Sequence, residues 1–367
     1  VVHKLNEKIG GKIGIPKAVD TFYQPAVKVL ADARAFMTGN KDSRWGLFVH
    51  LMEPHDPYFE HPNISGDGAA EYNGVGFARA EVEHPDPADA EYLKGVYVDE
   101  ITFMDKELGA FFDWMKREGV YDNSVIILTA DHGEEFFEHG GWWHGTTLYE
   151  EQIRVPLIVK LPGNELGGTR VPWQARSIDV APTIAAALGL EPGEGWQGKD
   201  LISDVRADLA EVEHREMTAQ IQSESAEITA EITGEEPVEP EVDPCAGYGH
   251  PYERMVISEE DFEGNQIASI RTGGLKFIKA NEGNPRGLQT FELYAMAADA
   301  GETTNLIEKD LPLCDGEAAS SKQRRLDKKL GEEIQNAMIG AVASDQAELS
   351  DDEIARLQAL GYMDVVE

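Results

Sequence analysis

Two stretches in the first third of the chain repeat apolar residues at helical spacing. Residues 25–37 place Ala26, Val29, Leu30, Ala33 and Met37 on one face. Residues 88–118 continue such a stripe over a longer span, through Leu93, Tyr97, Ile101, Met104, Leu108, Phe111, Phe112 and Met115. Stripes of this period predict two amphipathic helices that each bury one face against a core.

Short apolar runs between and after these helices predict strands. Residues 45–51 form one run, and residues 125–128 form another that is typical of a buried strand in a parallel sheet. Residues 155–161 predict the next strand, followed by a short strand at 176–180 and a helix at 182–188 that starts on a proline. The alternation of helices and strands predicts an α/β fold with a doubly wound mixed sheet.

The pattern changes near the carboxyl end. Residues 252–295 contain four short strand-like runs, at 255–257, 267–271, 275–279 and 290–294, with a Gly-Gly hairpin turn at 272–274. A polar helix is expected at 321–343 and a short one at 351–360. We therefore expect a small antiparallel α+β subdomain over residues 251–367.

Charge narrows the partners that the chain can have. The 367 residues include 68 acidic and 32 basic side chains, a formal net charge of −36. Such a chain is a poor partner for nucleic acid or an anionic membrane, and no apolar run approaches the roughly 18 residues of a membrane span. Residues 204–243 hold thirteen acidic residues against two arginines, so residues 203–250 are interpreted as a solvated acidic insertion. Cys245 and Cys314 do not form a C-x-x-C motif, which excludes a zinc ribbon and leaves one disulfide open.

The densest chemistry lies between the strands expected at 125–128 and 155–161. Asp131 and His132 directly follow the first of these strands, and Glu134, His139 and His144 lie on the loop that comes next. A further histidine, at position 55, stands between two prolines just after the strand expected at 45–51. Open α/β sheets bind their ligands at the carboxyl ends of their strands. The sequence therefore predicts a site where these loops meet.

In chain order, these segments resemble the sulfatase family of the alkaline-phosphatase superfamily. The resemblance is carried by F-V-H-L-M-E-P-H-D-P-Y, D-H-G-E, E-H-G, H-G-x-x-L-Y-E-E, R-V-P-L-I-V, P-G and the final L-x-x-L-G-Y. The family's nucleophile lies in a C-x-P-x-R or S-x-P-x-R segment whose Cys or Ser becomes formylglycine, and no such segment occurs in this sequence. The resemblance therefore implies an alkaline-phosphatase-like domain at 1–202 that lacks its amino-terminal part, in a chain that starts on Val1.

The resemblance also implies roles for individual residues. Asp131 and His132 match the family's metal-binding pair, with Ca²⁺ as the expected divalent ion. His55 and His144 match positions that contact the sulfate group and would serve as the catalytic histidines. Glu134 and His139 are candidate partners that orient His132 or His144, although a solvated acidic loop explains them equally well. No residue in this chain matches the nucleophile.

The resemblance favours a metal-assisted sulfuric ester hydrolase that acts on a small-molecule or saccharide sulfate ester. Two alternatives stay open. One keeps the fold and changes the ester, as in a phosphodiesterase, a phosphonate monoester hydrolase or a phosphoglycerol transferase. The other is a non-catalytic binding protein with a degenerate pocket. The resemblance alone favours a periplasmic or extracellular location, and the sequence leaves substrate identity and oligomeric state open.

Overall fold

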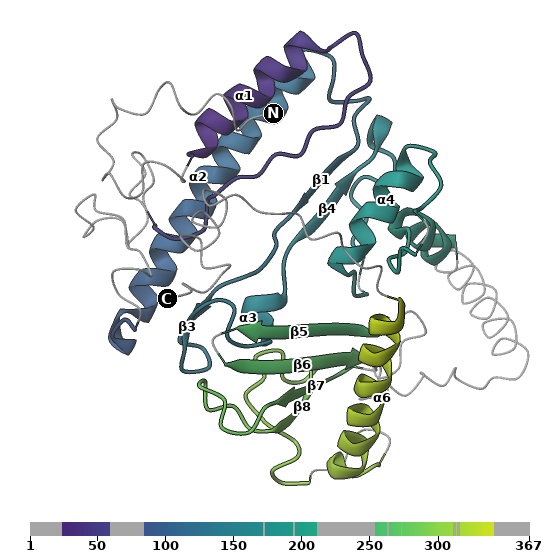
Figure 1. Cartoon of the computed structure of the whole chain (residues 1–367). Coiled ribbons are helices and arrows are strands. Elements are labelled where there is room, and N and C mark those ends of the chain that lie inside the picture. Colours follow the sequence, from purple (N-terminus) through teal and green to yellow (C-terminus); the bar gives the residue numbers. More distant parts are fainter. Residues whose placement is uncertain are drawn as a thin grey trace, which may run out of the picture.

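The chain has an α/β fold in which two long helices, a two-stranded ribbon and a carboxyl-terminal sheet surround the histidine-bearing loops (Figure 1). The computed structural model describes residues 24–58, 84–210 and 254–340, except positions 172, 194, 263, 273, 311, 312, 314 and 315. Most of the acidic insertion, the helix expected at 351–360 and both cysteines lie outside these residues. Among the described helices, none is both long and apolar enough to cross a membrane.

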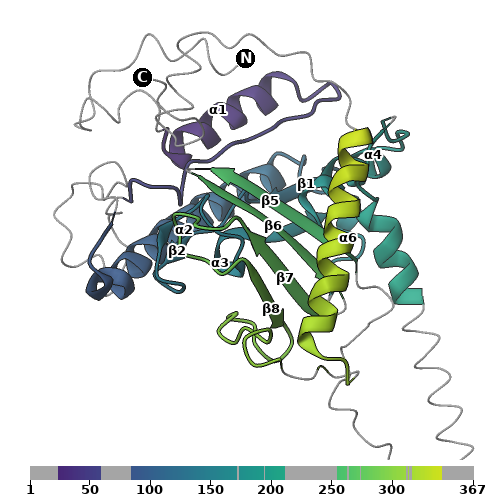
Figure 2. The ribbon, with the colours of Figure 1, turned by 60° about the horizontal axis from the view of Figure 1, so that its bottom comes forward.

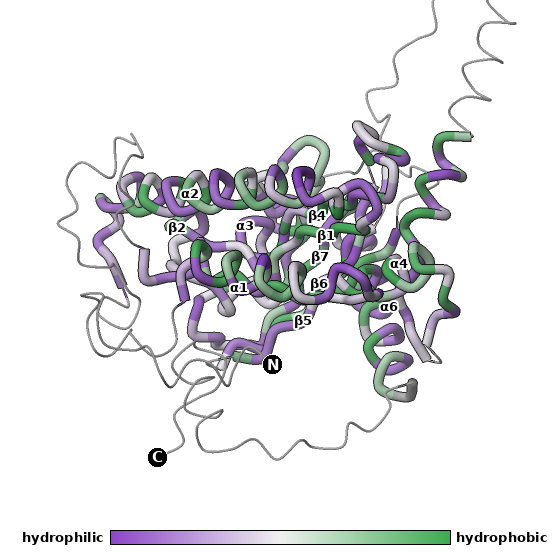
Figure 3. The backbone as a smooth tube through the Cα atoms, turned by 90° about the horizontal axis from the view of Figure 1, so that it is seen from above, coloured by the Kyte–Doolittle hydropathy of each residue, from purple (hydrophilic) through white to green (hydrophobic). Residues whose placement is uncertain are grey.

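Helices α1 (Ala26–Gly39) and α2 (Ala90–Arg117) pack side by side, as Figures 1 and 3 show. A short 3₁₀ turn, η2 (Pro87–Asp89), leads into α2. Both helices match their predicted positions, and the α1 residues buried are those of the predicted stripe, except the half-buried Val29. Figure 3 shows hydrophobic and hydrophilic residues alternating along α2, as an amphipathic helix requires. The buried Glu53 caps α1 by accepting a hydrogen bond from the Ala26 amide (2.8 Å), which ties the His55 loop to this helix.

Strands β1 (Ile126–Thr129) and β4 (Leu157–Lys160) form a two-stranded ribbon at the positions expected for 125–128 and 155–161. They pair antiparallel, so the parallel pairing expected for 125–128 is wrong for the partner that the structure describes. The physical reason lies in the connection. Between them the chain makes only the β2 (Glu135–Phe136) and β3 (Trp142–Trp143) hairpin and the single turn α3 (Glu150–Ile153). A parallel partner would need a crossover that returns the chain to the other end of the ribbon, usually through an α-helix longer than the single turn α3.

Two expected strands are wrong. Residues 45–51 have no described partner strand, although their burial alternates: Leu47 and Val49 pack against α1 and α2, while Phe48 is 88% exposed. Residues 176–180 instead form a 3₁₀ turn, η4 (Ser177–Asp179), because the Asp179 carboxylate accepts a hydrogen bond from the Arg176 amide at 2.9 Å and closes the turn. Helix α4 (Val180–Ala187) then follows, close to its expected position. Another 3₁₀ turn, η3 (Pro162–Asn164), comes directly after β4, and residues 201–210, beyond α4, are also helical.

The carboxyl-terminal part is a four-stranded antiparallel sheet in the order β5 (Val256–Phe262), β6 (Asn265–Thr272), β7 (Leu275–Ala280) and β8 (Phe291–Ala295). All four strands, the turn between β6 and β7, and helix α6 (Ala319–Gly340) agree with the sequence prediction. Figure 2 shows α6 crossing one face of the sheet, where Phe277, Leu293 and Leu330 form the core. The opposite face covers Leu148 and Tyr149 from the site loop. The domain boundaries at 202 and 250 stay predictions.

Candidate metal and oxyanion site

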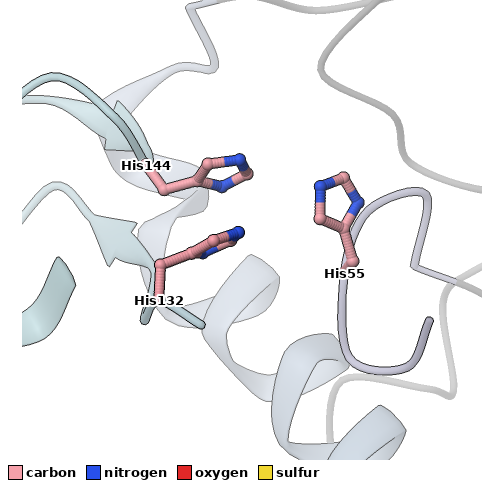
Figure 4. A group of neighbouring side chains, drawn as sticks. All are labelled: His55, His132 and His144. Carbon is pink, nitrogen blue, oxygen red and sulfur yellow. The ribbon is translucent and has the colours of Figure 1, made fainter. Parts of the chain in front are cut away.

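Three histidines from separate segments meet at one place. His55 lies on the turn that follows residues 45–51, His132 directly after β1, and His144 directly after β3. One ring nitrogen from each lies within 4.8 Å of the others. Figure 4 shows the His132 and His144 rings one above the other, with His55 facing them from the opposite side. The structure therefore brings together all three histidines that the sequence predicts for catalysis or metal binding.

Each ring is held through its Nδ1 atom. Nδ1 of His55 lies 2.6 Å from the Asp56 carbonyl, and Nδ1 of His132 lies 2.8 Å from the Gly133 carbonyl. Because a carbonyl oxygen can only accept, both nitrogens donate, and in the neutral ring the Nε2 lone pair is left available. The Nε2 atoms of His55 and His132 are buried and make no hydrogen bond to any described residue. Two ligand-ready nitrogens therefore face this space, which is how protein metal sites prepare their histidines.

The mutual orientation of His132 and His144 separates their roles. Their ring centroids are 3.9 Å apart and their planes are inclined by only 25°. The lone pair of an imidazole nitrogen lies in the ring plane, so the lone pairs of two stacked rings run side by side and do not converge on one nearby atom. The pair therefore suits two neighbouring atoms, such as a metal ion and an oxygen of a ligand bound to it.

Asp131 supplies the oxygen that a metal ion beside His132 would need. One carboxylate oxygen, Oδ1, lies 3.9 Å from Nε2 of His132 and accepts a hydrogen bond from the His132 amide at 3.0 Å. Metal–ligand bonds of about 2.0–2.5 Å span such a separation, so the two atoms can bind one ion together. The Asp131 side chain is 63% exposed. The chemistry of this pair fits a divalent ion that accepts both oxygen and nitrogen.

Glu134 connects His144 to the His55 loop. Its Oε1 lies 3.0 Å from Nδ1 of His144, and its Oε2 accepts a hydrogen bond from the buried Tyr58 hydroxyl at 2.8 Å. Burial raises the pKa of Glu134 to about 7. Burial, followed by the neighbouring His144, lowers the pKa of His132, which favours the neutral ring that a metal requires. Tyr58 is a site residue that the sequence analysis missed: it ends the segment F-V-H-L-M-E-P-H-D-P-Y, but no role was assigned to it there.

The backbone bends sharply on both sides of His144. Trp143 has a φ of 70° and Gly145 a φ of 79°, so both occupy the left-handed region. This conformation is costly for a large side chain such as Trp143, and it persists only where surrounding contacts impose it. Trp143 is buried in an aromatic cluster with Tyr58 and Phe136. The cluster thus fixes the turn that presents His144.

The remaining loop residues serve elsewhere. The described contacts of His139 are the Glu151 carboxylate (2.5 Å), the Glu302 carbonyl (3.2 Å) and the Tyr149 ring (3.7 Å between centroids), and none of these is one of the three histidines. Glu138 pairs with Lys94. A solvated acidic loop therefore does not explain Glu134, whose side chain is buried.

Comparisons with known proteins place this geometry in context. The family described as Sulfatase matches residues 12–190. Steryl-sulfatase of Rattus norvegicus is 27% identical over 201 residues, which cover 51% of this chain and 31% of that protein. The yidJ structure of Bacteroides fragilis has a TM-score of 0.54 at 16% identity, covering 85% of this chain and 59% of its own. Phosphonate monoester hydrolase of Agrobacterium radiobacter has a TM-score of 0.51 at 18% identity, covering 90% and 65%. At such identities the two structures show the fold alone, and this chain spans less than two thirds of each protein.

Proposed function

Because this chain belongs to the sulfatase family of the alkaline-phosphatase superfamily, we propose that it provides the metal and sulfate contacts of an enzyme that hydrolyses sulfate monoesters. The observation that carries the proposal is the convergence of His55, His132 and His144, each held through Nδ1. A degenerate pocket would have no reason to keep three rings aligned in this way. The family's nucleophile motif is not among the 367 residues, so no nucleophile is assigned here.

Asp131 and His132 are the proposed metal ligands. A divalent ion held there would neutralise the charge that develops on the sulfate oxygens. Ca²⁺ is the ion expected from the family, and the Asp131 carboxylate suits it. The nitrogen of His132 suits Zn²⁺ better, because calcium prefers oxygen ligands. A metal series therefore belongs in the test.

His55 and His144 are proposed to bind the sulfate oxygens. When Glu134 is a carboxylate, Nδ1 of His144 donates to it, so Nε2 can donate to an oxyanion only when the ring carries both protons. The carboxylate of Glu134 stabilises that cation electrostatically. Oδ1 of Asp56 lies 3.3 Å from Nδ1 of His55. Both rings can thus add positive charge where the ester's negative charge is greatest, and both can move a proton to or from the ester oxygen.

The test is turnover of 4-nitrophenyl sulfate by the protein expressed from its complete coding sequence, after chelation and after adding back Ca²⁺, Mn²⁺ or Zn²⁺. Asp131→Ala should remove bound metal and activity together. His55→Ala and His144→Ala should retain the metal and lose at least about 100-fold in turnover. His50→Ala is the matched control, because His50 is exposed and precedes the same loop. Unchanged turnover in His55→Ala and His144→Ala would refute the assignment.

The second candidate is a phosphonate monoester or phosphodiester hydrolase. It is favoured by the similarity of this fold to the Agrobacterium radiobacter enzyme, whose TM-score of 0.51 is close to that of yidJ. The same three histidines would then contact a phosphoryl group, which is also tetrahedral and anionic. Parallel assays of a sulfate ester, a phosphonate monoester and a phosphodiester on the same preparation decide between them by the ratio of kcat/KM.

A further inference from the structure

A single buried carboxylate holds the turn that carries His144. The Glu135 side chain is fully buried, next in sequence to the residue that holds the His144 ring. Its Oε1 accepts a hydrogen bond from the Gly141 amide at 2.8 Å, on the amino-terminal side of His144. Its Oε2 accepts one from Nε2 of Gln152 at 2.7 Å. The carboxylate therefore binds the turn directly at one end.

Gln152 extends this hold to the other end of the turn. The side chain is buried at the end of α3, and its Oε1 lies 3.3 Å from the amides of Thr146 and Thr147. Both amides lie on the carboxyl-terminal side of His144. The backbone on either side of His144 is thus fixed by Glu135, once directly and once through Gln152.

The cation that balances Glu135 comes from the carboxyl-terminal sheet. Nη2 of Arg286, on the connection between β7 and β8, lies 2.9 Å from both oxygens of Glu135. The guanidinium packs directly on Gly141, where an added Cβ would lie 1.2 Å from Nη1. The Arg286 amide in turn donates to the side chain of Asn265 on β6 at 3.2 Å. A residue of the distant sheet is therefore fitted against the turn of the site.

We infer that Glu135, Gln152 and Arg286 are positioning residues for His144. The inference rests on the proposed function, since it takes His144 as a residue that contacts the ester oxyanion. The physical argument is that a buried carboxylate without its cation is costly and must become hydrated or protonated. Without Arg286, Glu135 would release Gly141 and Gln152, and the His144 ring would lose its alignment.

The experiment uses the 367-residue chain labelled with ¹⁵N-histidine, with the His144 signals assigned through His144→Ala. In the unaltered chain, the ring should show the Nδ1–H tautomer, because Nδ1 donates to Glu134. Inorganic sulfate is the ligand probe, and its affinity is read from the same spectra. Arg286→Ala should remove the tautomer signature and weaken sulfate binding about 10- to 100-fold, the usual effect of losing such a supporting contact. Millimolar guanidinium should restore both, because it refills the space left by the side chain.

The controls separate positioning from general stability. Arg325→Gln, an exposed arginine of the same subdomain that pairs with Glu317, should change neither readout. Gln152→Leu keeps every charge and should also remove the tautomer signature, so it replaces Arg286→Ala if that variant unfolds. An unchanged signature in either folded variant overturns the inference. If the unaltered chain shows the tautomer and binds no sulfate, the proposed function fails while the positioning role still stands.

Discussion

Lys276 offers the most direct test of how the carboxyl-terminal sheet is joined to the site loop. This lysine is fully buried on β7, and its Nζ lies 2.7 Å from Oε1 of Glu302 and 3.2 Å from Oε1 of Glu150 at the start of α3. With an effective dielectric constant of about 20, each contact corresponds to roughly 5–6 kcal/mol of attraction, most of which offsets the cost of burying the charges.

We expect Lys276→Met to destabilise the chain by about 3 kcal/mol. Removing one partner of a buried pair costs about 3–5 kcal/mol, because the other charge is left unbalanced. The lower end applies here, since Glu150 keeps a 2.6 Å contact with Arg271. The measurement is urea unfolding at about pH 7 followed by fluorescence. Lys279→Met is the matched control on the same strand: it breaks an exposed pair with Asp327 and should cost less than about 1 kcal/mol.

The dependence on pH sharpens this prediction. Burial raises the pKa of Glu302, while Lys276 opposes that rise. In Lys276→Met nothing opposes the rise in the pKa of Glu302. The folded state then keeps Glu302 protonated at pH values where Glu302 of the unfolded state, which has a lower pKa, has already lost its proton. That stabilising contribution is complete below the unfolded pKa and is lost as pH rises, so the variant's deficit should be smaller near about pH 5 than near about pH 8. Equal losses for Lys276→Met and Lys279→Met, or a deficit independent of pH, would refute the reasoning.

Two further predictions concern other anchors. Asp179→Asn should cost about 2–4 kcal/mol near neutral pH. Burial raises the pKa of Asp179, but hydrogen bonds from Arg176 and the backbone outweigh burial and lower it. The ionised carboxylate therefore stabilises the fold above the pKa of the unfolded state. The loss of stability in Asp179→Asn, measured by urea unfolding, should shrink as pH falls below about 4. Gly133→Ala should cost at least about 2 kcal/mol, because the new Cβ would lie 2.0 Å from the Glu151 carbonyl oxygen; Gly109→Ala in α2 meets no atom within 4 Å and should stabilise by up to about 1 kcal/mol. Equal melting temperatures for the two alanine variants would contradict the second prediction.

The sequence predicted those elements whose stability is local. The strands β5 to β8 were found because each strand carries its own apolar pattern, and because short turns join β5 to β6 and β6 to β7. The strand predicted at residues 45–51 is wrong because a strand needs a pairing partner, which a local pattern does not reveal. The strand predicted at residues 176–180 is wrong because the Asp179 side chain accepts a hydrogen bond from the Arg176 amide and closes a turn.

The site divides in the same way. His55, His132 and His144 stand in recognisable motifs, and the structure brings them together. The contacts that hold them cannot be read from the motifs: Tyr58 reaches Glu134 across 76 positions, and Arg286 reaches Glu135 across 151. Contacts of such separation depend on the whole fold, so the residues around a site are harder to predict than those within it.

The two neighbouring glutamates of the site loop limit where this chain can tolerate insertions and deletions. Successive residues of an extended segment face opposite sides, so Glu134 reaches the His144 ring while Glu135 reaches the backbone beneath it. Removing or adding one residue just before this pair would leave one of the two positions without its glutamate, so either the His144 ring or the backbone beneath it would lose its carboxylate. Insertions and deletions should therefore be tolerated far less than substitutions between residues 131 and 144, and a library of single-codon insertions, scored for bound sulfate, would measure that intolerance.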